Sequence, residues 1–380
     1  MNKPIQVFWY CEKWQAGGIQ TIQVRLLDHM PLDQIHFDIA VSENDTDIFD
    51  DLLQREGVKK MVTLKRQYHG PGKRTLANFF SMRRYIRSGR YDVVHFNVCH
   101  GVELIYLFWA WLYRVPVRIV HCRNNDIGSG GRSRKLKIIC HEICKRVFGG
   151  CANVRLANSE LAKEWLFGGT HVSQSDVRIL KNGIDAESYR FDEHARNQLR
   201  KELGVENAYV IGHIGHFSYQ KNHEFLIEVF AKLMTYRPEA KLMLIGEGEE
   251  DAVRRQVELL GLNDHVLFLG AKKDIPPYMW AMDAFVLPSR FEGFGNVLIE
   301  AQAAGLCCFA SRDVIPDMVR ITENLTWISL DEGPEYWAKK IAEVAIDYTH
   351  EDHTGDVIRN GYDISCMAGE LIKIYKGSIG

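Results

Sequence analysis

Short apolar runs alternate with amphipathic stretches along the whole 380-residue chain. The runs resemble strands and lie at Gln6–Tyr10, Phe37–Val41, Met61–Leu64, Val93–Phe96, Val117–Cys122, Val154–Ala157, Val177–Leu180, Val210–Ile214, Lys241–Ile245, Val266–Leu269, Ala284–Leu287, Cys307–Ala310 and Thr326–Ile328. The segments between them have helical spacing, as in Asn222–Met234, where the apolar residues share one face. Repeated strand–helix–strand units predict an α/β fold of parallel sheets with helices on both faces.

The alternation restarts near residue 209, after a polar stretch over residues 185–207. A chain of 380 residues also has the length of two domains, at about 150 residues each. We therefore expect two doubly wound, Rossmann-like domains joined near residues 182–208. Ligands of such sheets bind outside the carboxyl ends of the strands, so candidate residues are those that directly follow a strand.

The formal net charge of −2 conceals an uneven distribution. Residues 1–180 hold 26 Lys and Arg against 17 Asp and Glu, a net charge of +9, and the remaining residues carry −11. One interpretation is chance clustering of solvated surface charge. The other is a basic half that meets an anionic partner and an acidic half that does not.

The cysteines and the apolar runs bear on the compartment. The nine cysteines include no Cys-x-x-Cys pair, which argues against a zinc ribbon and predicts reduced thiols in the cytosol. The chain opens into a strand-like run rather than a signal segment. The longest apolar run, Leu104–Tyr113, is too short to span a bilayer and predicts a buried helix. We expect a cytoplasmic protein without a metal site.

The strongest candidate cluster runs from Pro288 to Ala301, directly after a predicted strand. Gly293 and Gly295 let the backbone approach a ligand, and their N–H groups open the following helix. Glu292 at the strand exit and Glu300, about two turns into the helix, can accept hydrogen bonds from sugar hydroxyls. A helix N-terminus with an incidental acidic residue remains the alternative.

A second cluster follows the run Val210–Ile214. A glycine-containing loop leads to Lys221, and Asn222 is a candidate N-cap of the next helix. A lysine beside a helix N-terminus is well placed to neutralise a diphosphate. The alternative is an exposed lysine without a ligand.

The first half offers weaker candidates. Gly17 and Gly18 follow the first strand and leave room for a ligand, although a tight turn explains them equally well. His95, His121 and Arg123 lie near two strand ends. A histidine there can bind a substrate hydroxyl or phosphate, but the sequence alone favours a satisfied, semi-buried core histidine.

Taken together, these residues resemble the GT-B glycosyltransferases, specifically the family-4 retaining enzymes of bacterial exopolysaccharide and capsule assembly. The resemblance runs nearly end to end, and its most specific element is the Glu-x7-Glu pair of Glu292 and Glu300. The weaker motifs that accompany the pair are Gly17–Gly18, Asp92–His95, Asn158–Glu160, Lys181–Asp185, Gly215–Lys221 and Leu244–Gly248.

The resemblance implies a role for each matched position. Glu300 would bind the nucleotide ribose, and Glu292 would lie against the transferred sugar, whose hydroxyls the backbone of Phe294, Gly295 and Asn296 would hold. The diphosphate would be held by Lys221 and by the Gly17–Gly18 loop. His121 would contact the donor sugar near the reacting centre, with His95 and Arg123 also at the cleft.

The resemblance also implies an organisation. Residues 1–182 would form the acceptor-binding domain, residues 183–361 would bind the nucleotide-sugar, and a helix within residues 362–380 would return to the first domain. The substrates would be a nucleotide-sugar, most simply a UDP-sugar, and a glycan or polyprenyl-diphosphate-linked acceptor. No cofactor, metal or nucleic acid is expected.

One position departs from the family pattern. His216 stands where the family usually places an arginine five residues before the lysine that corresponds to Lys221. A histidine carries only partial charge near neutral pH. We expect either that Arg290 or Arg123 supplies the missing charge, or that turnover falls as pH rises through the histidine pKa. His216 also fits a non-catalytic partner subunit that assists another transferase. A third class, epimerisation or phosphorolysis of nucleotide-sugars on the same fold, fits the motifs less well.

The basic half contains a candidate membrane surface. Residues 132–137 form a basic segment followed by the apolar residues Ile138, Ile139, Ile143 and Val147. An amphipathic helix of this type predicts contact with anionic lipid, at the inner face of the cell membrane.

Overall fold

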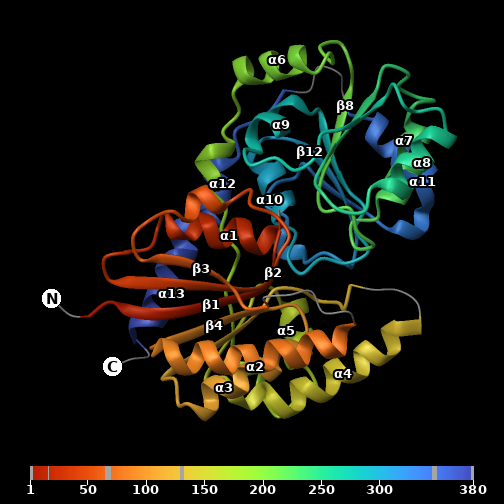
Figure 1. The fold of residues 1–380 in the computed structure, drawn as a ribbon. Helices are drawn as coiled ribbons and strands as arrows, with labels where there is room; N and C mark the ends of the chain where they lie inside the picture. Colours follow the sequence, from red (N-terminus) through yellow and green to blue (C-terminus); the bar gives the residue numbers. More distant parts are fainter. Residues whose placement is uncertain (1–2, 16, 65–69, 129–131, 345–348, 378–380) are drawn as a thin grey trace. The chain divides into compact units, whose positions relative to one another are not determined.

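The computed structural model describes residues 3–15, 17–64, 70–128, 132–344 and 349–377, without the side chains of residues 71, 132 and 133. The chain forms two compact units (Figure 1). The first unit comprises residues 1–183 and 364–380, and the second unit comprises residues 184–363. Each unit is built on one parallel sheet, so the predicted α/β fold class is confirmed.

The first unit has a seven-stranded sheet in the order β3-β2-β1-β4-β5-β6-β7. Its strands are β1 Ile5–Trp14, β2 Ile35–Asn44, β3 Val58–Val62, β4 Val93–Val98, β5 Val117–Cys122, β6 Val154–Ala157 and β7 Val177–Ile179. Its helices are α1 Gly18–Leu27, α2 Pro71–Gly89, α3 Leu107–Leu112, α4 Arg132–Phe148, α5 Glu160–Phe167 and α13 Ile364–Gly377.

Both faces of this sheet are covered. Along β1, Val7 and Trp9 pack in the core that includes residues of α1 and α13, whereas Phe8 and Tyr10 pack in the core that includes residues of α2 and α3. Successive side chains of a strand point to opposite faces, so a strand covered on both faces needs an unbroken apolar run. This requirement explains why the strands stand out in the sequence.

The run Leu104–Tyr113 differs from its prediction. It was expected to form one buried helix, but a 3-10 helix covers Gly101–Tyr106 before α3 begins at Leu107. Trp111 and Leu112 of α3 are 49% and 47% exposed. The run is therefore only partly a core segment.

The second unit has a six-stranded sheet in the order β10-β9-β8-β11-β12-β13. Its strands are β8 Val210–Ile214, β9 Lys241–Ile245, β10 Val266–Phe268, β11 Ala284–Leu287, β12 Cys307–Ser311 and β13 Leu325–Ile328. Its helices are α6 Glu193–Glu202, α7 His223–Leu233, α8 Asp251–Leu259, α9 Pro276–Ala281, α10 Asn296–Ala303, α11 Gly333–Ala342 and α12 Thr354–Arg359.

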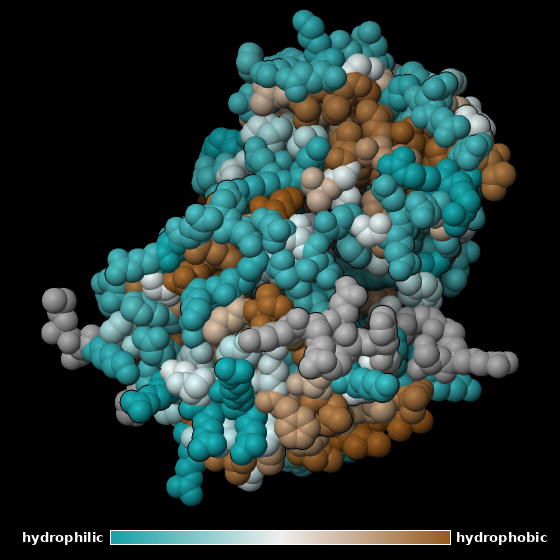
Figure 2. All heavy atoms as spheres, viewed as in Figure 1, coloured by the Kyte–Doolittle hydropathy of each residue, from teal (hydrophilic) through white to brown (hydrophobic). Residues whose placement is uncertain are grey.

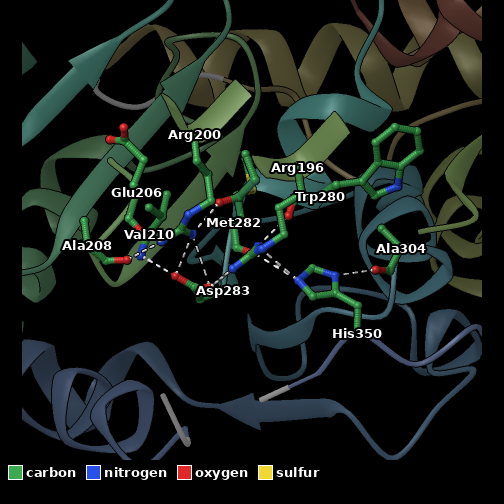
Figure 3. Close-up of polar contacts among 11 residues, drawn as sticks. Arg196, Arg200, Glu206, Ala208, Val210, Trp280, Met282, Asp283, Ala304 and His350 are labelled. Carbon is green, nitrogen blue, oxygen red and sulfur yellow. Dashed lines mark hydrogen bonds and ion pairs between the residues drawn. The ribbon is translucent and has the colours of Figure 1, made fainter. Parts of the chain in front are cut away.

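An ion-pair network ties α6 to the amino ends of β8 and β11 (Figure 3). Asp283, directly before β11, accepts a hydrogen bond from the backbone N–H of Val210 at 2.7 Å and pairs with Arg196 and Arg200. Arg196 also donates to the Met282 carbonyl at 2.6 Å. Charges with little access to water are tolerated when they are paired and hydrogen-bonded, and the side chains of Arg196, Asp283 and Arg200 are only 17%, 15% and 8% exposed. It lies at the edge opposite the carboxyl ends, so it supports the sheet rather than a ligand.

His350 completes the network in Figure 3 as a neutral side chain. Burial lowers its pKa. Its Nδ1 lies 2.8 Å from the Ala304 carbonyl oxygen, and its Nε2 lies 3.1 Å from the Met282 carbonyl oxygen and 3.3 Å from Arg196 Nη1. The ring also stacks on Phe191, with centroids 4.3 Å apart.

Candidate active site

The strand order creates one topological switch point in each unit. β1 lies between β2 and β4 in the first unit, and β8 lies between β9 and β11 in the second. The chain leaves these central strands toward opposite sides, which opens a crevice at the carboxyl edge of the sheet. The candidate residues follow β1, β4 and β5 in the first unit and β8 and β11 in the second.

The loop after β8 places Lys221 over a glycine. A Cβ added to Gly215 would lie 2.8 Å from Lys221 Cε and 3.0 Å from its Cδ, so the lysine stem crosses the position that a side chain would occupy. Asn222 is the N-cap residue of α7, as predicted, but its side chain makes no capping hydrogen bond. Its φ is 58°, and Nδ2 donates instead to the Pro288 carbonyl at 3.0 Å. That hydrogen bond ties the loop after β8 to the loop after β11.

The loop after β11 presents Glu292 and the N-terminus of α10. Glu292 is buried, and Ser289 Oγ donates to its Oε1 at 2.7 Å while Gln220 Nε2 donates to its Oε2 at 3.2 Å. Gly295 has a φ of 91° and caps α10, a conformation that favours glycine. Glu300 is half-buried in the fifth position of α10, nearer the helix start than the two turns expected.

Lys221 and Glu292 form the central contact of this edge. Lys221 Nζ lies 2.6 Å from Glu292 Oε1, and the two side chains are only 15% and 7% exposed. A cation and an anion held together at low exposure form a site that can exchange partners with a charged, hydroxyl-bearing ligand. Both residues were predicted from sequence, and the structure brings them together.

Of the other predicted residues of this unit, Arg290 and His216 lie in the two loops, whereas the Phe294 side chain lies in the core. Arg290 lies in the same loop and stacks on Tyr219 at 4.3 Å, and its Nη1 donates to the Tyr219 carbonyl at 2.8 Å. His216 packs beside Gly248, where a Cβ would lie 2.9 Å from His216 Nε2. The Phe294 side chain instead belongs to the core, 6.0 Å from the Tyr362 ring, and Asn296 is the first residue of α10.

In the first unit, Gly17 is the N-cap of α1, and Gly18 is its first residue. No side chain of the described residues caps α1, so the backbone N–H groups of its first turn are available to acceptors of a ligand or solvent. Among the residues that the structure describes, no hydrogen bond joins these two glycines to His95, His121 or Arg123. Their predicted role toward a diphosphate stays a prediction.

His95 and His121 are fully buried and lie next to each other at 3.3 Å, Nε2 to Nδ1. Burial, with the charge of Arg123, lowers the pKa of both histidines well below the usual range. The sequence favoured a satisfied core histidine at these positions. His95 fits that description, but His121 Nε2 is buried and has no hydrogen-bond partner among the described residues.

Arg123 is held by asparagines. Its Nε donates to Asn97 Oδ1 at 2.8 Å, its Nη1 donates to Asn182 Oδ1 at 2.5 Å, and its carbonyl accepts from Asn158 Nδ2 at 3.2 Å. Burial lowers its pKa to about 10, so the guanidinium stays charged at neutral pH. Nη2 is buried without a partner among the described residues. The carboxyl edge of the first unit thus holds two buried nitrogens, on His121 and Arg123, for which the described residues offer no acceptor.

The sequence did not identify the residues that hydrogen-bond to Glu292 and Arg123 and hold them in place. Gln220 and Ser289 adjoin predicted motifs, and their positions directly before Lys221 and three residues before Glu292 were the available signal. Asn182 lies in the motif Lys181–Asp185, but nothing in that motif linked it to Arg123, 59 residues away. Asn97 gave no signal, because it reaches Arg123 from 26 residues away.

One group of side chains in the described part of the chain has metal-ligand spacing. Glu12, His100 and Glu103 bring ligand atoms within 4.8 Å of one another. The Arg74 guanidinium already pairs with Glu12 at 2.5 Å, and burial raises the pKa of Glu103. An arginine and a protonated acid leave this group poorly suited to a divalent cation.

A pocket of about 600 Å³ opens in the second unit beside Tyr219, between the loop after β8 and α8. Its charged lining consists of Glu224, Glu249, Glu250, Asp251, Arg255 and Arg290. The four carboxylates against two arginines disfavour an anion, so the pocket does not suit a diphosphate.

Two Rossmann-like units, each with candidate residues at the switch point, define the GT-B class of glycosyltransferases. The sequence agrees: residues 16–188 match the model "Glycosyltransferase Family 4", and residues 195–362 match "Glycosyl transferases group 1". The protein EpsF of Bacillus subtilis (strain 168), named as a glycosyltransferase, is 30% identical over 94% of this chain and 93% of its own length. The chain belongs to the family-4 glycosyltransferases.

Two further similarities are informative. An Escherichia coli protein named UDP-Gal:alpha-D-GlcNAc-diphosphoundecaprenol alpha-1,3-galactosyltransferase is 24% identical over 78% of this chain and 76% of its own length. The crystal structure of Anabaena HepE in complex with UDP and glucose has a TM-score of 0.78 at 20% identity, over 97% of this chain and 98% of that chain. This second likeness is one of fold, and it confirms the predicted GT-B architecture.

Among the helices in the described part of the chain, none combines the length and the apolar composition that crossing a bilayer requires.

Proposed function

We propose that this chain is a retaining, metal-independent glycosyltransferase of surface polysaccharide synthesis, as in exopolysaccharide or capsule assembly. It moves a sugar from a UDP-sugar to a hydroxyl of a glycan or polyprenyl-diphosphate-linked saccharide. The observation that carries the proposal is the 2.6 Å pair of Lys221 and Glu292 at the switch point of the second unit. The name of the Escherichia coli relative supports the UDP-sugar and the lipid-linked acceptor.

The donor binds along the carboxyl edge of the second unit. Lys221 releases Glu292 and neutralises the diphosphate, and Glu292 accepts hydrogen bonds from the sugar hydroxyls. The backbone N–H groups at the start of α10, around Gly295 and Asn296, donate to the same sugar. Glu300 accepts from the ribose diol.

The reaction breaks the bond between the anomeric carbon and the phosphate oxygen and forms a bond to the acceptor oxygen on the same face. The acceptor proton passes to the departing phosphate oxygen, so no protein base is needed. Lys221 stabilises the charge that develops on the diphosphate, in place of a metal ion. Glu292 acts by position and charge.

Because His216 stands where the family usually has an arginine, another residue has to supply a permanent positive charge near the diphosphate. Arg290 is the candidate in the same unit as Lys221, and its loop joins the loop of Lys221 through the hydrogen bond from Arg290 N–H to the Gln220 carbonyl at 2.8 Å. Arg123 in the first unit is the other. If His216 itself carries the charge, turnover falls as pH rises between about 6 and 8, and this fall disappears in His216→Ala. A flat profile in both proteins excludes His216.

We further propose that the first unit rests on an anionic bilayer through α4. Leu136, Ile139, Ile143 and Val147 are 65%, 54%, 56% and 62% exposed. Their spacing puts them on one face of the helix. Figure 2 shows the hydrophobic area along the lower edge of the first unit, where Figure 1 draws α3 and α4.

The charges around this face favour anionic lipid as the occupant. Lys135, Lys137 and Arg146 are exposed on α4, and Arg83 and Arg84 are exposed on α2. An apolar stripe with basic flanks binds anionic membranes through both effects. The predicted segment 132–137 supplies part of this charge, although the side chains of residues 132 and 133 lie outside the described residues.

Sedimentation with liposomes tests this surface. We expect the protein to sediment with vesicles of anionic lipid and not with vesicles of phosphatidylcholine, and the variant Ile139→Ser/Ile143→Ser to lose sedimentation. Leu259→Ser, at an apolar side chain of the second unit that is 86% exposed, is the matched control and should sediment like the parent. Equal sedimentation of parent and double variant, or a concentration-dependent dimer that the double variant abolishes, would overturn the assignment.

Sugar transfer by the purified chain tests the activity. A screen of UDP-sugars with polyprenyl-diphosphate-linked acceptors should give a glycosylated lipid whose new linkage has the anomeric configuration of the donor. Transfer with the opposite configuration contradicts retention. Transfer only when a second transferase is added supports the non-catalytic alternative instead.

A further inference from the structure

Three buried side chains form a line of hydrogen bonds in the first unit. Tyr375 Oη, on α13, lies 2.7 Å from Nδ1 of His95 on β4. Nε2 of His95 lies 3.3 Å from Nδ1 of His121 on β5. All three side chains are fully buried. The planes of the two imidazoles are only 10° apart, as expected for rings joined edge to edge by an N–H···N hydrogen bond.

The line has a direction. Among the described residues, His95 is the only hydrogen-bond partner of Tyr375 Oη, so the buried hydroxyl donates its proton to His95 Nδ1. His95 Nδ1 is then an acceptor, and in a neutral imidazole Nε2 must carry the proton. His95 Nε2–H donates to His121 Nδ1, which leaves the proton of His121 on Nε2.

The neutral state of the line is favoured by its surroundings. Burial lowers the pKa of His95 and of His121, and the neighbouring guanidinium of Arg123 lowers both further. Burial also raises the pKa of Tyr375. A single tautomer of each imidazole can therefore persist at neutral pH.

The last donor of the line, His121 Nε2–H, has no acceptor among the residues that the structure describes. His121 Nε2 is buried and lacks a partner among the described residues, as does Nη2 of Arg123 two positions later. Residues two apart on extended chain lie on the same face of a sheet. A buried donor without an acceptor destabilises the protein, and a bound oxygen atom would remove that cost. Two such donors at the carboxyl edge point to an oxygen-rich ligand.

We propose that Tyr375 and His95 are positioning residues that fix His121 as an Nε2–H donor to a substrate oxygen, either a sugar hydroxyl or a phosphate oxygen. The proposal rests on the proposed glycosyl transfer for the identity of the ligand. The direction of the hydrogen bonds does not depend on it.

Nitrogen-15 NMR of the histidine rings in the full-length chain tests the direction. Protonated and unprotonated ring nitrogens have well-separated shifts, and His121→Gln assigns the signals. We expect His121 of the parent to carry its proton on Nε2 and to become a mixture of tautomers in Tyr375→Phe. Tyr209→Phe, which removes a buried hydroxyl that donates to the Ile341 carbonyl in the second unit, should leave the His121 signals unchanged.

Kinetics test the consequence. Tyr375→Phe should lower kcat about tenfold with a smaller change in the donor KM, the pattern of an interaction made mainly in the transition state. His95→Gln keeps an N–H group that can donate to His121 and should retain the Nε2 tautomer, whereas His95→Leu should lose it. An Nδ1–H tautomer in the parent, or unchanged tautomer and kcat in Tyr375→Phe, would overturn the proposal.

The two ligand sources are distinguished by titration. A shift of the His121 Nε2 signal with UDP alone identifies a phosphate oxygen, and a shift only with a UDP-sugar identifies a sugar hydroxyl. If the parent transfers no sugar, the proposed function fails while the tautomer measurement still decides the direction of the line.

Discussion

Lys221 Nζ lies 2.6 Å from Glu292 Oε1, and this contact joins the loops after β8 and β11. The two charges satisfy each other where a donor is proposed to bind. A diphosphate that pairs with Lys221 frees the carboxylate of Glu292 to accept hydrogen bonds from sugar hydroxyls. The ion pair between the two residues is then replaced by one contact with the diphosphate and one with the sugar. The pair therefore links binding of the two parts of the donor.

The first prediction concerns Lys221. Lys221→Met should weaken UDP binding at least tenfold, about 1.4 kcal/mol, because the charge opposite the diphosphate is lost. Isothermal titration of UDP measures this loss. Lys232→Met, which removes an exposed lysine of α7 that pairs with Glu335 at 3.6 Å, is the matched control.

The lysine variant leaves a buried carboxylate without its partner, which destabilises the fold independently of binding. Lys221→Met/Glu292→Gln removes that unpaired charge. The account holds if the double variant is more stable than Lys221→Met and still binds UDP weakly. It fails if the double variant binds UDP as tightly as the parent.

Gly215 provides a test that leaves both charges in place. Gly215→Ala should lower UDP affinity several-fold with a stability change below about 1 kcal/mol, because the new Cβ would lie 2.8 Å from a flexible lysine stem that can move aside. Gly369→Ala in α13, where a Cβ would meet nothing within 4 Å, is the control for the substitution itself. Unchanged UDP affinity in Gly215→Ala would show that the lysine position is not critical.

The pH dependence of stability tests the buried histidines. Burial lowers the pKa of His223 to about 2. At about pH 5 the imidazole is therefore protonated in the unfolded chain and neutral in the folded chain. With an unfolded pKa of about 6.5, this difference removes about 2 kcal/mol of stability as pH falls from about 7 to 5. His223→Phe should lose that much less over the same interval, measured by urea unfolding at both pH values.

The same variant should be no less stable than the parent at pH 7. Neither ring nitrogen of His223 has a hydrogen-bond partner among the described residues, and the ring stacks on Phe217 with centroids 4.2 Å apart. An equal pH dependence in parent and variant would contradict the assigned neutral state.

The network in Figure 3 predicts a stability effect without a binding effect. Asp283→Ala should destabilise the second unit by about 3–5 kcal/mol, because it leaves Arg196 and Arg200 without their carboxylate. Glu343→Ala removes an exposed partner of Lys340 and should cost less than about 1 kcal/mol. Similar losses in both variants, measured by denaturant unfolding, would contradict the structural role of Asp283.

The sequence predicted the fold well because its strands are covered on both faces. Such strands read as apolar runs, as Phe8 and Trp9 illustrate by packing into different cores from adjacent positions. It also predicted Lys221 and Glu292, since both follow a strand at a switch point. Residues that follow strands are visible in a linear pattern.

Contacts between distant segments were not visible. Tyr375 meets His95 from 280 residues away, and Arg196 meets Asp283 from 87 residues away. Neither contact has a local motif, because each depends on how a helix docks on the sheet. Asn222 is the N-cap residue of α7, as predicted, but its side chain donates to the carbonyl of Pro288 in another loop and makes no capping hydrogen bond.

The central claim is that Glu292 positions the transferred sugar while Lys221 holds the diphosphate. The most direct measurement compares Glu292→Gln with the parent in UDP binding and in sugar transfer from a UDP-sugar. We predict that UDP affinity stays within about threefold of the parent while transfer falls by about 10²–10³, as for loss of one preorganised electrostatic contact. Transfer at the parental rate in Glu292→Gln would contradict the account.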